Sequence, residues 1–167
     1  MRRKSFSTMA CPIARGLDRV GEWWSILILR DAFAGMTRFD EFQASLGIAP
    51  SMLTRRLNAL VAGGLLERHR YSDKPPRDEY RLTPRGADFR AVLIAMLAWG
   101  NRHFAPEGPS IQIVEAESGV AADPVMVDRR TGKLVAAPDF ILALGPAASD
   151  GARARLARSG VLLEDRS

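Results

Sequence analysis

The sequence has one cysteine, Cys11, and two histidines among its 167 residues. A lone cysteine forms no internal disulfide, which suits a reducing compartment, and no pair of cysteines exists to hold zinc. The longest apolar run, Ala91–Trp99, is far shorter than a membrane-spanning helix. The basic start "MRRKSFSTMACPIARG" lacks the apolar stretch of a signal peptide. We therefore expect a cytoplasmic protein with no metal and no membrane contact.

Catalytic motifs are also missing. The sequence has no glycine-rich nucleotide loop and no nucleophile elbow, and His69 and His103 fall in elements that suggest no shared site. We expect neither an enzyme nor a bound cofactor. No internal repeat is evident in the sequence.

Positive charge is concentrated in the first two-thirds of the chain. Residues 1–104 hold 17 Lys and Arg against 10 Asp and Glu, whereas residues 105–167 hold 7 against 9. An excess of this kind is typical of a domain that binds a polyanion such as nucleic acid. The expected partner therefore belongs to the first part of the chain.

Hydrophobic spacing and capping signals predict helices at 11–35 (with a joint near Gly21), 37–47, 49–64 and 83–104. Thr37 and Thr83 are the expected caps of the second and fourth of these segments. The runs "LLERHRY" and "EYRLT" alternate as strands do, and "SDKPPRD" joins them, with two prolines that disfavour strand and helix alike. After a linker at 105–109, strand-like runs at 110–116, 124–136 and 140–145 precede a short helix at 149–160.

The helix at 49–64 buries a single stripe formed by Leu53, Leu57 and Leu60. Its opposite face is polar and carries no acidic residue. A helix of this kind fits the DNA major groove, where arginine donates two hydrogen bonds to guanine and short polar groups reach bases or phosphates. The hairpin carries further cations toward a neighbouring groove or the backbone. The candidate DNA-binding residues are Ser51, Thr54, Arg55, Arg56 and Asn58 on the helix, with Arg38, Arg68, Arg70, Lys74 and Arg77 around it. For any single arginine, a solvated surface role is the competing interpretation.

The element order is that of a winged helix-turn-helix, a mainly α fold with a β-hairpin wing (α+β). Residues 11–104 closely resemble the HxlR-type transcriptional regulators, which are related to the MarR group. The resemblance rests on Cys11-Pro12, Trp24 followed by "ILILRD", Phe39 with "DEF", "MLTRRL", "GLLER" and "EYRLTPRG". It implies a homodimer on double-stranded DNA, in which "SMLTRRL" reads the bases and "RYSDKPPRDEY" is the wing. It also implies that the first and the long C-terminal helices form the dimer, with candidate interface residues Phe89, Val92, Leu93, Met96, Leu97 and Trp99.

Two domains are expected: 1–104, the DNA-binding and dimerisation domain, and 105–167, a small β-rich extension. Some HxlR-type proteins carry an extension resembling a zinc ribbon. The counterparts here are "ESG" at 117–119 and "RRTG" at 129–132, which hold no cysteine. We expect a metal-free unit stabilised by packing alone, or a module for a ligand or partner.

Three residues are candidates for sensing a signal. A cysteine at a helix start is favoured as thiolate, so Cys11 is a candidate redox sensor, against the alternative of a small buried apolar residue. Trp23 and Trp24 are candidates for lining a small-molecule effector pocket, against plain core or interface packing. The expected function is sequence-specific transcriptional regulation, by repression, on a palindromic operator. The alternative is a protein-interaction module that keeps the fold and no longer binds DNA.

Overall fold

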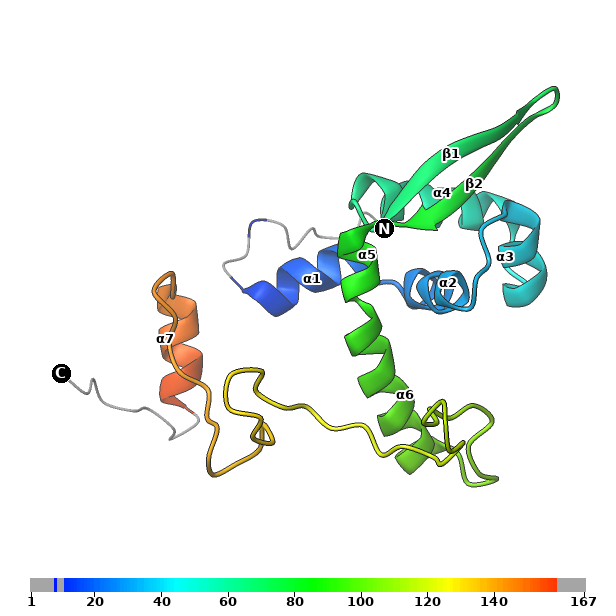
Figure 1. Cartoon of the computed structure of the whole chain (residues 1–167). Helices are drawn as coiled ribbons and strands as arrows, with labels where there is room; N and C mark the ends of the chain where they lie inside the picture. Colours follow the sequence, from blue (N-terminus) through cyan, green and yellow to red (C-terminus); the bar gives the residue numbers. More distant parts are fainter. Residues whose placement is uncertain (1–7, 9–10, 159–167) are drawn as a thin grey trace. The chain divides into compact units, whose positions relative to one another are not determined.

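The computed structural model describes residue 8 and residues 11–158, and its elements follow the predicted order (Figure 1). Most of the basic start and the predicted end of the last helix, residues 159–160, lie outside the described residues. The elements are α1 (Pro12–Val20), α2 (Trp23–Phe33), α3 (Phe39–Leu46), α4 (Pro50–Ala62), β1 (Leu66–Asp73), β2 (Pro76–Leu82), α5 (Pro84–Asp88), α6 (Arg90–Phe104) and α7 (Asp150–Ala157). No helix in the described ranges has the length and apolarity that crossing a bilayer requires.

The chain divides into two compact units. Arg19–Pro124 contains α2 to α6 and the hairpin, whereas Met1–Asp18 and Val125–Ser167 form the other unit. The boundary predicted after Phe104 falls inside the first unit. The core of buried apolar side chains belongs to this first unit. It comes from the end of α1, from α2, α3 and α4 with the turns that follow α3 and α4, and from the hairpin: Val20, Ile28, Leu29, Phe42, Ile48, Leu53, Leu57, Leu60, Leu65, Leu66 and Tyr80.

The turn between α3 and α4 sets the position of α4. Gly47 ends α3 in the left-handed conformation (φ 59°), and Pro50 opens α4 in its first turn. The predicted cap at Thr37 is wrong, because α3 begins one residue later, after Arg38. Glu41 supplies the cap instead: its Oε2 accepts hydrogen bonds from the backbone N–H groups of Thr37 (2.9 Å) and Arg38 (2.8 Å). The hydrogen bond from Arg38 contributes most, and that from Thr37 next, to a lowered pKa of the Glu41 carboxyl.

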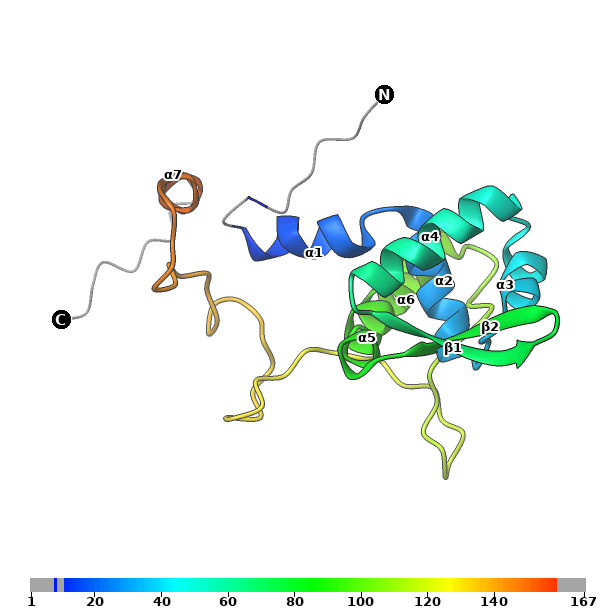
Figure 2. The same cartoon turned by 90° about the horizontal axis from the view of Figure 1, so that it is seen from above.

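The hairpin of β1 and β2 projects beyond the helices (Figures 1 and 2). The strands are antiparallel, with Leu66 opposite Leu82, Arg70 opposite Asp78 and Asp73 opposite Pro76. They run closer to the tip than predicted and include Pro76. A two-stranded sheet has only edge strands, and at the first position of such a strand a missing N–H costs little.

The predicted long helix at 83–104 is divided into α5 and α6 at Phe89. The Thr83 hydroxyl caps α5 as predicted, accepting from the Gly86 N–H (3.0 Å), and donates to the carbonyl oxygen of Gly64 (2.7 Å). A Cβ at Gly86 would lie 2.0 Å from the carbonyl oxygen of Leu65. The residue between the two helices, Phe89, keeps a right-handed helical conformation (φ −66°, ψ −12°).

The segment at 105–149 has less β structure than its sequence predicts. It contains isolated bridges, Val114 with Ala121 and Val127 with Leu134, where continuous strands are expected. Most of its apolar side chains are exposed, from Ile111 to Leu144, so no packed face holds strands together.

Each of these bridges encloses a turn, and the two turns are alike, although no internal repeat is evident in the sequence. At a spacing of 13 residues, an acidic side chain accepts from a hydroxyl three positions on, and a left-handed glycine follows. The glycine N–H donates to the carbonyl oxygen of the acidic residue, at 2.9 Å in one turn and 2.7 Å in the other. The turns contain Glu115, Ser118 and Gly119 in the first case, and Asp128, Thr131 and Gly132 in the second.

Candidate nucleic-acid interface

Helix α4 has the two faces that the sequence predicts. Leu53, Leu57 and Leu60 are fully buried in the core. The opposite face is exposed and carries four of the predicted contacts, namely Ser51, Thr54, Arg55 and Asn58. The buried stripe fixes the helix while its polar face stays open, which is the arrangement that a groove-reading helix needs.

Arg55 is the cation on this face that no carboxylate of the described residues neutralises. Its Nη2 atom lies 3.1 Å from the sulfur of Met52, a weak acceptor, so its other donors are available. The Thr54 hydroxyl donates to the carbonyl oxygen of Pro50 at 2.9 Å, which leaves its lone pairs to accept. On this geometry Arg55 has the strongest free donor set of the face.

Arg56 does not lie on this face. Its side chain is only 14% exposed and its Nη2 atom lies 3.2 Å from Oε2 of Glu22, the residue that precedes α2. Adjacent helical positions differ in direction by about 100°, so two neighbouring arginines cannot both face the same groove. The prediction that Arg56 contacts DNA therefore disagrees with the position of its side chain, which ties α4 to the start of α2.

The wing arginines near α4 are engaged with other side chains. Arg68 donates to the Asn58 side chain, so Asn58 joins the reading helix to the wing. Arg68 and Arg70 both pair with Asp78, at 3.9 Å and 2.7 Å. The hydrogen bond from Arg70 to Asp78 raises the pKa of that guanidinium further. Sequence reasoning missed Asp78, although aligning β1 against β2 in register places it opposite Arg70.

The wing tip is different. Lys74 and Arg77 are exposed, and neither makes an ion pair among the residues that the structure describes. Both cations are therefore available to an external anion.

At the other side of the wing, the Arg38 guanidinium lies 5.0 Å from the centre of the Tyr71 ring. The backbones of Arg38 and Glu79 form an isolated antiparallel β-bridge. Beside it, Tyr80 donates its backbone N–H to the carbonyl oxygen of Thr37 at 2.7 Å. The start of α3 and the wing are thus joined.

The two tryptophans at the start of α2 do not share a cavity. Trp23 is 76% exposed, whereas Trp24 packs against the core. Their adjacent positions on one helix send the two indoles in different directions. The two tryptophans therefore do not line the common effector pocket predicted for them.

Cys11 is half-buried and lies directly before α1. The pKa of its thiol is lowered, chiefly by a hydrogen bond from the backbone N–H of Ala14 and also by Ile13. The positive charges of Arg155 and Arg15 act in the same direction. This environment favours the thiolate, as the sequence predicts for a helix start.

The six apolar residues predicted for the dimer interface have three different surroundings. Phe89 and Leu93 pack against the core of their own unit. The three residues Val92, Met96 and Trp99 are exposed, and Trp99 makes an edge contact with Phe104 at 4.8 Å between ring centres. Leu97 is half-buried and lines a cavity between α6 and the segment that follows it.

Comparison with known proteins supports this geometry. A family model described as HxlR-like helix-turn-helix matches residues 19–108. The HTH-type transcriptional regulator Rv3095 of Mycobacterium tuberculosis is 39% identical over 148 residues, covering 88% of this chain and 91% of that protein. A transcription factor of Pseudomonas aeruginosa, PA1374, aligns at 56% identity with a TM-score of 0.63, covering 87% of this chain and 99% of that chain. The redox regulator HypR, in its reduced form, aligns at 33% identity with a TM-score of 0.52, covering 56% of this chain and 95% of that chain.

Proposed function

The chain belongs to the HxlR-like helix-turn-helix family and is a DNA-binding transcriptional regulator, and from that premise we propose that it represses transcription as a homodimer on a palindromic operator. The observation that carries the proposal is α4, whose leucine stripe is buried while Ser51, Thr54 and Arg55 face outward. Arg55 reads a guanine in the major groove, and Lys74 and Arg77 contact the backbone or the adjacent minor groove.

The dimer forms through the exposed apolar residues of α6. Val92, Met96 and Trp99 form an exposed apolar stripe at helical spacing along α6. Two copies joined in this way present two reading helices. Their half-sites lie about one helical turn of DNA apart.

The first experiment measures binding of the purified chain to fluorescent DNA from the region upstream of its own gene. The assay covers a salt series and includes random DNA as competitor. We expect competitor-resistant binding that weakens steeply with salt, and a loss of about 5- to 100-fold in specific affinity for Arg55→Gln. Arg90→Gln, an exposed arginine on α6, is the matched control. Absence of DNA binding at low salt overturns the proposal, and a reporter that rises when the gene is deleted tests repression.

A thiol signal at Cys11 is the second part of the proposal. The lowered pKa of Cys11 and the likeness to HypR, a redox regulator, support it. Alkylation by iodoacetamide forms a carbon–sulfur bond at the thiolate with loss of iodide. We expect alkylation to change the DNA affinity of the native chain and not that of Cys11→Ser. Equal affinity before and after complete alkylation of the native chain contradicts the sensing role.

A further inference from the structure

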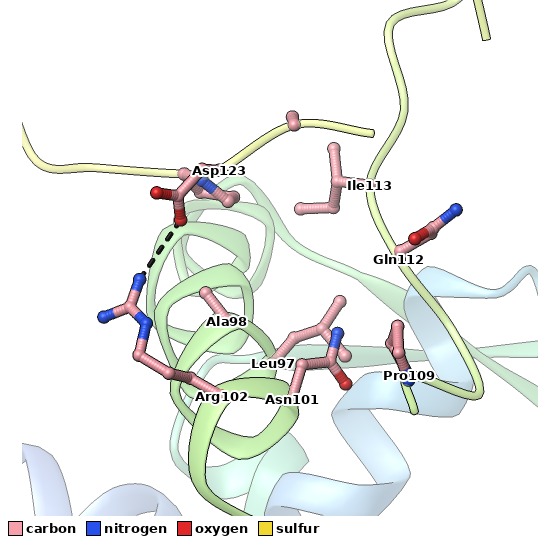
Figure 3. Close-up of a pocket in the computed structure, with 10 residues that line it drawn as sticks. Leu97, Ala98, Asn101, Arg102, Pro109, Gln112, Ile113 and Asp123 are labelled. Carbon is pink, nitrogen blue, oxygen red and sulfur yellow. Dashed lines mark hydrogen bonds and ion pairs between the residues drawn. The ribbon is translucent and has the colours of Figure 1, made fainter. Parts of the chain in front are cut away.

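A cavity of about 310 Å³ lies between the second half of α6 and the loop that follows it (Figure 3). One wall comes from α6 through Leu97, Ala98, Asn101 and Arg102. The other comes from the returning segment through Pro109, Gln112, Ile113, Ala122, Asp123 and Pro124. The whole site lies within the unit Arg19–Pro124, and most of its second wall lies beyond the residues that the family model matches. The cavity therefore is not part of the shared helix-turn-helix core.

Two side-chain tethers hold the loop over the helix. Asn101 donates from Nδ2 to the carbonyl oxygen of Ile111 at 2.9 Å. Arg102 places its Nη2 atom 3.1 Å from Oδ1 of Asp123. Figure 3 shows Leu97 and Ile113 pointing into the space between the walls, with the Arg102–Asp123 pair at one end. The cavity is thus lined by aliphatic side chains and by the amide side chains of Asn101 and Gln112, with an ion pair at one rim.

The chemistry of the rim indicates the polar group of a ligand. Arg102 has five N–H donors, and its planar fork matches the two oxygens of a carboxylate. Asp123 occupies one of those donors, but its side chain is 80% exposed and that of Arg102 is 59% exposed. Ion pairs this exposed are weak, so a carboxylate with apolar cover can replace Asp123. Asp123 thus marks the position that a ligand carboxylate takes.

The walls indicate the rest of the ligand. The apolar side chains that line the cavity are aliphatic, and no aromatic ring is among them. The volume corresponds to about ten water molecules at their liquid density. A short hydrocarbon chain fits such a space and gains from leaving water, whereas a second carboxylate would meet no cation there, only the neutral amides of Asn101 and Gln112.

We propose that this cavity binds a short-chain aliphatic monocarboxylate, with the carboxylate on Arg102 in place of Asp123 and the chain against Leu97, Ala98 and Ile113. Binding breaks the Arg102–Asp123 tether between α6 and the segment that leads to residue 125. The site deepens the regulatory part of the proposed function, because α6 carries the proposed dimer stripe. The binding itself is independent of DNA and is measured without it.

The test titrates the full chain with sodium hexanoate and follows the α6 and loop amides by NMR and the midpoint of thermal unfolding. Hexanamide and hexylammonium are the matched neutral and cationic probes, and inorganic phosphate is the anion control. We expect saturable binding of hexanoate, with a rise in the midpoint, and none for the other three. Equal binding of hexanamide or phosphate overturns the assignment of a carboxylate.

Substituting the two partners of the ion pair should change the affinity for hexanoate in opposite directions. Arg102→Gln is expected to weaken hexanoate binding by about tenfold or more, because a charged hydrogen-bond partner is lost. Asp123→Asn is expected to tighten it about threefold or more, because the competing carboxylate is gone. Ala98→Leu fills the cavity and should abolish binding, whereas Arg90→Gln on the same helix should leave it unchanged. Binding that is the same in native, Arg102→Gln and Ala98→Leu chains overturns the proposal, whatever the DNA assay gives.

Discussion

Arg56 and Glu22, 34 positions apart in the sequence, form an ion pair at 3.2 Å between Nη2 and Oε2. The pair joins the reading helix to the residue at the joint of α1 and α2. It is more sheltered than the other ion pairs around α4, since the Arg56 side chain is 14% exposed. Of the two neighbouring arginines of α4, one therefore faces the solvent and the other holds the helix in place.

Replacing Arg56 is expected to change stability first. Arg56→Gln removes the sheltered ion pair with Glu22 and should lower the free energy of unfolding by about 1–3 kcal/mol. Arg55→Gln, on the exposed face, should change it by less than about 0.5 kcal/mol. Urea unfolding and DNA titration of both variants separate the two roles. A stable Arg56→Gln chain that no longer binds DNA would contradict the assignment.

Removing Asp78 is expected to strengthen non-specific DNA binding. Asp78→Asn frees Arg68 and Arg70 from their shared carboxylate and adds one positive charge beside the groove-reading helix. The slope of log affinity against log salt should become steeper by up to about one. Asp88→Asn makes the same charge change on α5 and is the control. Identical slopes for the two variants would show that the wing arginines do not meet phosphate.

The contribution of Glu41 depends on pH. The pKa of Glu41 is lowered in the folded chain, so its stabilisation is present above the unfolded value of about 4.3 and is lost as the pH falls through the folded value. Glu41→Gln should therefore be less stable than the native chain at pH 6–7, and the gap should close as the pH falls below 4. Glu107→Gln, at an exposed position, should show no such gap. A constant difference from pH 3 to pH 7 would contradict the capping role.

Two glycines are expected to respond in opposite directions to alanine. Gly86→Ala places a Cβ 2.0 Å from the backbone carbonyl oxygen of Leu65, which requires a shift of the hairpin base and should cost more than about 2 kcal/mol. Gly100→Ala meets nothing within 4 Å on α6 and should stabilise the chain by about 0.5–1 kcal/mol. Thermal unfolding of the two variants tests this. Similar midpoints would contradict the close approach at Gly86.

Substitutions at an exposed and at a packed apolar residue of α6 are expected to have different effects, one on dimer formation and the other on the stability of the fold. Met96→Glu, at an exposed position, should weaken the dimer about tenfold or more with little effect on the protomer's fold. Leu93→Ala removes a side chain packed against the core and should lower stability by about 1–3 kcal/mol. Sedimentation velocity and urea unfolding measure the two quantities. A Met96→Glu chain that dimerises as the native one does would move the interface elsewhere.

Local features were predictable from the sequence, and long-range pairings were not. The stripe of Leu53, Leu57 and Leu60 follows from helical periodicity alone, and so do Gly47 and Pro50 as the limits of the turn. Helical periodicity also separates the two arginines, because Arg55 lies opposite the leucine stripe and Arg56 lies beside it. The long-range part is the partner of Arg56, Glu22, a residue outside α4.

The division at Phe89 was missed for a related reason. The apolar pattern of residues 83–104 continues without interruption, so helical periodicity gives no sign of a break at Phe89. Asp78 was within reach of sequence reasoning, because the register of the hairpin alone places it opposite Arg70. The two turns were expected in part, since the sequence pairs "ESG" with "RRTG"; the acidic side chains that close them, Glu115 and Asp128, were not singled out.

The turns at Glu115–Gly119 and Asp128–Gly132 have the character of a duplicated module. Each closes itself with an acidic side chain, a hydroxyl and a left-handed glycine, so each is independent of what packs around it. Each turn therefore has its own closing bonds within five residues, and a substitution in one leaves the bonds of the other in place.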